Sequence, residues 1–166
     1  MNKIYLAGFD VFRQDAVEHG NSLKQLCEAY GFEGLFPLDN AAPPELSGNA
    51  LAQWIYESNI GLIGQADLVI ANVNNFRGAE PDSGTCFEIG FAIASQKPVW
   101  VYLEDSRPLI EQIPHSHAGN GVFLDSDGYV IENFCFPRNL MIACSSRLVV
   151  GGAEECLRQL KLHMAR

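Results

Sequence analysis

Two carboxylates in the segment 74–88 have a spacing that suits catalysis. Asp82 lies in a stretch rich in glycine and proline, and Glu88 follows it at the start of a predicted helix. If both side chains face one crevice, one carboxylate can attack a substrate while the other handles a proton on the leaving group. A structural role is the alternative, because Thr85-x-x-Glu88 matches a capping box and Asp82 suits a turn. The spacing alone favours the structural role.

The chain around these carboxylates predicts alternating strands and helices. Short apolar runs, typical of strands, occupy residues 4–7, 34–37, 67–73, 98–103 and 148–150. Apolar residues at helical spacing occupy residues 14–30, 51–65, 84–96 and 153–164. The runs at 67–73 and 98–103 are mostly apolar without alternation, as in strands that are buried on both faces of a parallel sheet. We therefore expect an α/β fold with a flavodoxin- or Rossmann-like, doubly wound, mainly parallel sheet and right-handed crossovers.

Ligands of such a sheet bind at the carboxyl ends of its strands. The loops after Ala7, Pro37, Val73 and Leu103 are therefore the places where chemistry is expected, and the carboxylate pair follows the third of them. Residues 104–120 show little periodicity and are long enough to form a functional loop or lid.

Length and charge exclude several classes of protein. A chain of 166 residues is long enough for one domain and too short for two, so we expect residues 1–166 to form a single domain. The formal net charge of −9 disfavours nucleic acid and anionic membranes as partners, since both attract clustered Lys and Arg. No apolar run approaches the roughly 20 residues that span a bilayer. The first residues indicate a strand rather than a signal peptide, which predicts a cytoplasmic protein.

The sequence indicates no metal site. Its five cysteines are widely spaced and form no C-x-x-C pair, so we expect most of them to be small buried hydrophobic residues in a reducing compartment. His115 and His117 form a lone H-x-H, with no nearby cysteine or third histidine to complete a ligand set. We interpret them as loop residues.

A resemblance changes the balance between the catalytic and the structural interpretation. The pattern Arg-Gly-x-Glu-Pro-Asp-x-Gly-Thr-x-Phe-Glu at residues 77–88 resembles the signature of the nucleoside 2-deoxyribosyltransferase family. Four shorter matches occur in the family's order, at the strand 4–8, the Pro-Leu-Asp-Asn loop 37–40, Asn59, and the Asn-Leu-Met of 139–141. The chain departs from part of the family at residues 9–10, where Phe-Asp replaces Gly-Pro. The resemblance therefore does not define the base-facing side of the pocket.

The resemblance implies a role for each matching residue. Glu88 is expected to attack C1′ of the deoxyribose, and Asp82 to handle the proton of the departing and incoming bases. Tyr5 would hold Glu88 in position. Asn59 and the Asn139 of a neighbouring subunit would hold the sugar hydroxyls, which implies a homodimer or a higher homo-oligomer with shared active sites.

The substrates implied are a 2′-deoxynucleoside and a free purine or pyrimidine base, exchanged in the manner of a retaining glycosidase without a metal or cofactor. Asp39, Gly8 and Gly84 stand in the matching motifs and are assigned to substrate binding. Phe12, which follows the first strand among polar residues, is the aromatic side chain that we expect to stack on the base, with Phe9, Phe76 and Trp54 as weaker candidates. A helix N-terminus would favour ionisation of the nucleophile.

Two other functions remain open. One is a related hydrolase that removes the base from a deoxynucleoside 5′-monophosphate, which would need a phosphate cradle after the first strand. The carboxylate of Asp10 in that position would repel a phosphate. The other is a nucleotide-sensing module without catalysis on the same fold. The presence of both carboxylates favours an enzyme over such a module.

Overall fold

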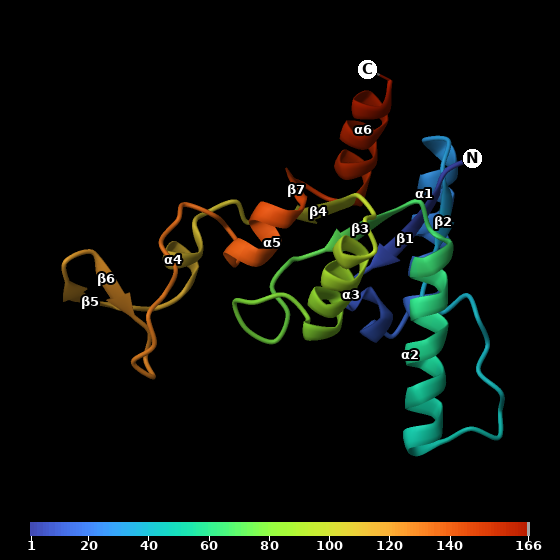
Figure 1. The fold of residues 1–166 in the computed structure, drawn as a ribbon, viewed down its shortest axis with the longest axis horizontal. Helices are drawn as coiled ribbons and strands as arrows, with labels where there is room; N and C mark the ends of the chain where they lie inside the picture. The colour runs from blue at the N-terminus through green and yellow to red at the C-terminus, as the bar shows by residue number, and fades with distance from the viewer. Residues whose placement is uncertain (166) are drawn as a thin grey trace.

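A computed structural model of the protein describes residues 1–165 and contains a sheet covered by helices on both faces (Figure 1). The elements of the N-terminal half are β1 (Lys3–Ala7), the 3₁₀ helix η1 (Phe9–Phe12), α1 (Ala16–Ala29), β2 (Glu33–Leu35), α2 (Gly48–Gln65) and β3 (Leu68–Asn72). Those of the C-terminal half are α3 (Ser83–Ala94), β4 (Val99–Leu103), α4 (Leu109–Gln112), β5 (Ser116–Gly119), β6 (Val122–Leu124), α5 (Leu140–Ser145), β7 (Arg147–Val150) and α6 (Ala153–Met164).

The main sheet has five strands in the order β2-β1-β3-β4-β7, and every neighbouring pair is parallel. Helices α2 and α3 pack on one face, while α1 and α6 pack on the other. This is the doubly wound α/β arrangement, in a single domain, that the sequence predicted. The strand order reverses between β1 and β3, and this switch point is where such sheets bind ligands.

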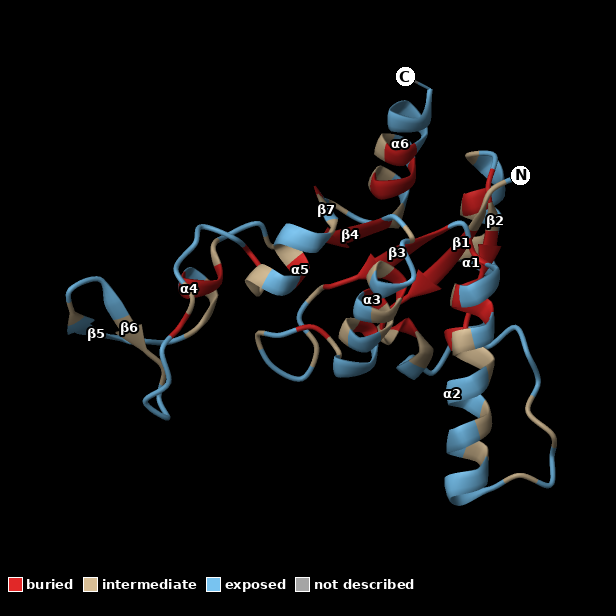
Figure 2. Cartoon of the chain, in the orientation of Figure 1, coloured by how far each residue is buried: buried red, intermediate tan, exposed pale blue. Residues whose placement is uncertain are grey.

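Alternation along the strands divides the core into two layers. Tyr5 and Val69 belong to the cluster under α2 and α3, whereas Ile4 and Ile70 belong to the cluster under α1 and α6. Both layers are buried, so the central strands β3 and β4 are red along their length in Figure 2, whereas the edge strand β7 is only partly buried. Because successive strand residues point to opposite faces, the register of β1 directs Tyr5 toward α3.

The segment between β4 and α5 differs from the prediction. Residues 104–120, which were expected to form a loop or lid, instead begin an arm that carries α4 and the antiparallel hairpin β5–β6, and this arm projects away from the sheet (Figure 1). The hairpin turns at Gly119-Asn120-Gly121, where all three residues have a positive φ. Glycine and asparagine tolerate that conformation, so this tripeptide was the signal for a turn. The short helix α5 was also missed.

The cysteines and the helices give two further results. Cys27 and Cys156 are buried and Cys86 is half-buried, but Cys135 and Cys144 are exposed, so the expectation of mostly buried cysteines is wrong for those two. Within residues 1–165, no helix is both long and apolar enough to cross a membrane.

Candidate active site

The site is centred on a hydrogen bond between Tyr5 and Glu88. The Tyr5 hydroxyl donates to Glu88 Oε1 over 2.6 Å, and the Tyr5 side chain is fully buried in β1. Glu88 is the sixth residue of α3 and therefore lies in its second turn, rather than in the first turn as the sequence suggested. Its side chain reaches the sheet instead of the backbone N–H groups at the helix end. The capping-box interpretation of Thr85 and Glu88 is therefore wrong.

Burial controls the charge of Glu88. It raises the pKa of the Glu88 carboxyl to about 7, with the hydrogen bond from Tyr5 acting to lower that pKa and the negative charge of Asp82 acting to raise it. The expected help from the helix N-terminus is small, because that effect fades beyond the first turn. Burial and the neighbouring carboxylate also raise the pKa of Tyr5 well above its ordinary value. Tyr5 therefore stays a neutral donor while Glu88 changes charge near neutral pH.

Asp82 caps the same helix. Its Oδ2 accepts from the backbone N–H of Thr85 over 2.9 Å and from the Thr85 hydroxyl over 3.0 Å, and Thr85 is buried. A Cβ on Gly84 would lie 3.1 Å from the same oxygen, so glycine leaves this carboxylate room. Asp82 and Glu88 thus belong to the two ends of one short stretch of α3, and the charge of Asp82 acts on the pKa of Glu88. Neither of these two hydrogen bonds to Asp82 uses Oδ1.

Asn59 carries an unsatisfied polar atom. It lies on α2 one turn before Ile63, which is buried in the core cluster that contains Tyr5. Asn59 Oδ1 is buried and has no hydrogen-bond partner within residues 1–165. A buried acceptor without a partner is costly, so this oxygen is suited to a donor that arrives with a ligand.

Gly8 allows β1 and β3 to approach each other closely at their carboxyl ends. A Cβ at Gly8 would lie 2.9 Å from the Cβ of Asn72 and 2.7 Å from Asp10 Oδ2. Asp10 itself is buried, accepts from Asn72 Nδ2 over 3.0 Å and pairs with His19 Nε2 at 3.1 Å. Its carboxylate is therefore occupied by protein partners and contributes to holding the strand ends together.

Aromatic rings from two loops stack beside these strand ends. Phe76 lies between Phe9 and Phe12, with ring centroids 5.0 Å and 5.4 Å apart respectively and nearly parallel planes. The guanidinium of Arg77 lies 4.6 Å from the Phe76 centroid. More than half of the Phe12 side chain is exposed, so the ring predicted to stack on a base remains accessible. Trp54 is half-buried on α2 and is not part of this stack.

Two residues predicted from the sequence have hydrogen-bond partners other than Tyr5 and Glu88. Asp39 pairs with Lys24 and accepts from the backbone N–H of Phe36 over 2.8 Å, so it holds the loop after β2. Asn139 caps α5, because its Oδ1 accepts from the N–H of Met141 over 2.9 Å. No hydrogen bond within residues 1–165 connects either side chain to Tyr5 or Glu88.

Asn139 instead borders an apolar cavity of about 530 Å³ between α3 and α5. The same cavity is lined by Cys86 and Gly90 of α3. Each of these is two residues from Glu88, which corresponds to a rotation of about 200° around the helix. Asn139 and Glu88 of one chain therefore lie on opposite sides of α3.

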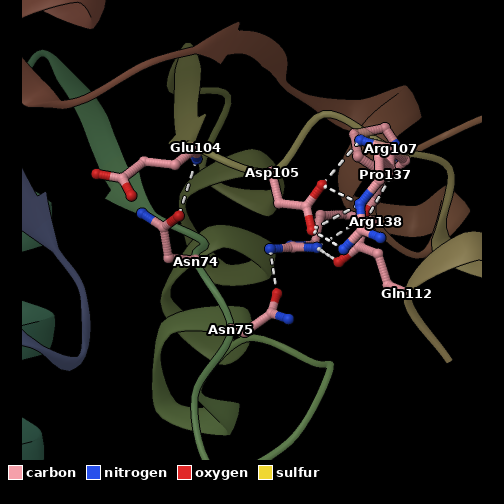
Figure 3. Close-up of polar contacts among 8 residues, drawn as sticks. All are labelled: Asn74, Asn75, Glu104, Asp105, Arg107, Gln112, Pro137 and Arg138. Atoms are coloured by element: carbon pink, nitrogen blue, oxygen red, sulfur yellow. Dashed lines mark hydrogen bonds and ion pairs between the residues drawn. The ribbon is translucent and has the colours of Figure 1, made fainter.

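One buried residue near the site was missed. Arg138 is fully buried and binds Val73, which directly follows β3. It also binds Asn75 of the following loop, and Gln112 and Pro137 at the base of the arm (Figure 3). An isolated arginine next to Pro137 gives no periodic or motif signal, so sequence reasoning had no means to place it inside. Within residues 1–165, no group of three or more His, Cys, Asp or Glu side chains is arranged to hold a metal ion.

The fold and the site define a class of α/β proteins in which a half-buried carboxylate is held by a tyrosine of β1. A model of the nucleoside 2-deoxyribosyltransferase family matches residues 4–141, and the chain belongs to this family. The fold is similar to that of a 2-desoxiribosyltransferase from Leishmania mexicana, with a TM-score of 0.80, 32% sequence identity, and coverage of 98% of this chain and 99% of that one.

Two other proteins are similar. A conserved protein from Enterococcus faecalis V583 has the same fold, with a TM-score of 0.66, 24% identity, and coverage of 98% of this chain and 99% of that one. An uncharacterized protein of Schizosaccharomyces pombe is 29% identical over 155 residues, which cover 83% of this chain and 74% of that protein.

Proposed function

We propose that the protein is a nucleoside 2-deoxyribosyltransferase that exchanges the base of 2′-deoxynucleosides through a covalent deoxyribosyl-Glu88 intermediate. The observation that carries this proposal is the 2.6 Å hydrogen bond from the buried Tyr5 to the half-buried Glu88. One carboxylate oxygen is fixed by the tyrosine, which leaves the other to act as a nucleophile. Membership of the family and the similarity to the Leishmania mexicana protein support the assignment.

In the first step an ionised Glu88 oxygen attacks C1′ from the side opposite the base. The new C1′–O bond forms as the C1′–N bond breaks, and the bonding electrons leave with the base nitrogen. The base receives a proton as it leaves, and we assign the passing of that proton to Asp82 Oδ1, which neither hydrogen bond from Thr85 occupies. A deoxysugar reaches the cationic transition state more easily than a ribose, since no electron-withdrawing 2′-hydroxyl destabilises it.

In the second step an acceptor base reverses these events. Its nitrogen attacks C1′, the C1′–O bond to Glu88 breaks, and Asp82 takes up the proton that the acceptor loses. Two inversions at one carbon give net retention, as in retaining glycosidases. A pKa of about 7 makes Glu88 a competent nucleophile and also a good leaving group at neutral pH.

The remaining family residues supply binding. The free oxygen of Asn59 accepts from a sugar hydroxyl, which satisfies its buried hydrogen-bonding capacity. The exposed ring of Phe12 stacks on the base. Asn139 lies on the far side of α3 from Glu88, so we assign it to the site of a second subunit in a homo-oligomer.

The test is incubation with deoxyinosine, with and without free adenine, followed by chromatography. Deoxyadenosine formed when adenine is present establishes transfer. Release of hypoxanthine at the same rate without adenine would instead establish hydrolysis. A parallel sample with deoxyinosine 5′-monophosphate tests the related nucleotide hydrolase, and binding without any product would indicate a sensing module.

A further inference from the structure

Arg138 occupies an unusual environment for a charged residue. Its side chain is fully buried, and its guanidinium donates four hydrogen bonds. Two acceptors are backbone carbonyls, that of Val73 at 2.6 Å and that of Pro137 at 2.6 Å. The other two are side-chain amide oxygens, Asn75 Oδ1 at 2.6 Å and Gln112 Oε1 at 3.0 Å.

These four acceptors belong to two different parts of the molecule, and Figure 3 shows three of them, Asn75, Gln112 and Pro137. Val73 and Asn75 begin the loop that leaves β3 and ends at Asp82. Gln112 ends α4, and Pro137 is where the arm returns to the domain. A second link joins the same region, because Asn74 Oδ1 accepts from the backbone N–H of Glu104 over 2.8 Å. Arg138 is thus the point where the loop of the candidate site is attached to the base of the arm.

The charge of Arg138 has no direct counterion. Within residues 1–165, no carboxylate lies within ion-pair distance of it, and nearby Asp105 is paired with Arg107. Burial lowers the pKa of Arg138, while the charges of Glu80 and Asp105 act in the opposite direction. A buried, unpaired guanidinium is a poor means of stabilising a fold. Its benefit is geometric, since a planar group with several donors fixes four acceptors in one arrangement.

We propose that Arg138 is a positioning residue that sets the loop 73–82 so that Asp82 can deliver its proton to the leaving base. This inference rests on the proposed function. Arg138 touches neither Asp82 nor Glu88 by hydrogen bonding and acts through the backbone at Val73 and the side chain of Asn75. Thr85 holds Asp82 on its helical side, and the loop that leads to Asp82 starts at the residues that Arg138 binds.

The consequence depends on the leaving group. A donor such as deoxyinosine needs a proton on its base as the C1′–N bond breaks. A donor such as 7-methyl-2′-deoxyguanosine already carries a positive charge on its base, which leaves as a neutral molecule without a proton from the enzyme. A loop that misplaces Asp82 therefore slows the first donor and spares the second. General loss of folded protein slows both by the same factor.

The experiment compares kcat for these two donors in wild-type protein and in Arg138→Lys, which keeps the charge but cannot reproduce the four-bond geometry. We expect a loss of about tenfold or more with deoxyinosine, since displacing a catalytic group by about 1 Å has effects of this order. With 7-methyl-2′-deoxyguanosine we expect at most about a twofold change. Asp82→Asn should show the same selectivity, and the double variant should lose no more than Asp82→Asn alone.

Two further variants keep the test decisive. Arg158→Met removes an exposed arginine of α6 that pairs with Glu155, and it should leave both rates unchanged. If Arg138→Lys fails to fold, Asn75→Ala removes one exposed partner of the guanidinium and should give a smaller loss with the same selectivity.

If the wild-type protein cleaves both donors and the variant loses the same factor on each, the role of Arg138 is overturned. Wild-type protein that cleaves neither donor overturns the proposed function itself, together with this inference.

Discussion

At Glu88, burial and hydrogen bonding act on the carboxylate in opposite directions. Burial raises the pKa and the Tyr5 hydroxyl lowers it, with a net value of about 7. A carboxylate with a much lower pKa would be a weaker nucleophile, because its ion is more stable. A carboxylate with a much higher pKa would be protonated at neutral pH and could not attack. Tyr5 therefore sets both the position and the basicity of Glu88.

Replacing Tyr5 with Phe tests this coupling. Without the hydrogen bond the pKa of Glu88 rises further, so the acid limb of the pH–rate profile, expected near pH 7 in the wild type, should move to higher pH. A hydrogen bond to a charged group supports a shift of about one pH unit. The measurement is kcat/KM from pH 5 to 10 with deoxyinosine and adenine. An acid limb that stays in place or moves to lower pH would show that Tyr5 does not stabilise the carboxylate.

Glu88→Gln should lose activity and gain stability. The amide is a poor nucleophile, so transfer should fall to background. The unfolded chain releases the proton of Glu88 near pH 4.5, whereas the folded protein keeps it up to about pH 7. The free energy of unfolding therefore falls as the pH rises through this window, and the whole loss is present above it. At pH 8 the variant should therefore unfold at a temperature several degrees above the wild type, from a gain of about 1–3 kcal/mol.

At pH 4 the same comparison should show little difference, because both forms of residue 88 are then neutral. Thermal unfolding followed by circular dichroism at the two pH values provides the measurement. A variant that is less stable than the wild type at pH 8 would contradict the view that a buried charge is held at this position.

At the level of elements, helix α3 positions both carboxylates of the candidate site. Asp82 is its N-cap and Glu88 faces the sheet from its second turn. The cap fixes where the helix begins, and the helix then fixes where Glu88 meets Tyr5. One carboxylate thus orients the other, through about two turns of backbone.

Asp82→Asn separates the two roles of this residue. Asparagine is as good an N-cap as aspartate, so the stability of α3 should change by no more than about 0.5 kcal/mol. An amide cannot pass a proton as a carboxyl group does, so cleavage of deoxyinosine should fall by about 100-fold. Thermal unfolding and the rate of cleavage on the same preparation measure both effects. A folded Asn variant with a wild-type rate would assign the proton to another group.

Element placement could be predicted where apolar runs are unambiguous. The continuous runs that became β3 and β4 identified a parallel sheet, and the periodic segment 153–164 gave α6 without error. The helix and strands of the arm were not predictable, because its short apolar segments have the periodicity of neither helix nor strand, although Gly119-Asn120-Gly121 signalled its turn. The contact between Tyr5 and Glu88 was predictable through a family motif. The burial of Arg138 and the raised pKa of Glu88 depend on tertiary packing, which local sequence does not encode.

At the scale of the whole molecule, α3 separates two surfaces. One carries Glu88 against the sheet, and the other borders the cavity where Asn139 lies. A single chain therefore does not bring these two side chains into one pocket. If Asn139 binds a sugar hydroxyl, it does so in the site of another copy, and two-fold symmetry makes that contribution reciprocal.

Mixed dimers test this arrangement. Glu88→Ala removes the nucleophile, and Asn139→Ser shortens the amide while keeping an oxygen that can cap α5. The two inactive proteins, each with a different size tag, are unfolded together and refolded in equal amounts. About half of the dimers should be mixed, and each of these has one site with both native residues, so roughly a quarter of wild-type transfer should return. A site built within one chain cannot be restored in this way, because every chain in the mixture lacks one of the two residues. Confirmed mixed dimers whose activity is no greater than the sum of the two separate variants would therefore reject the shared site.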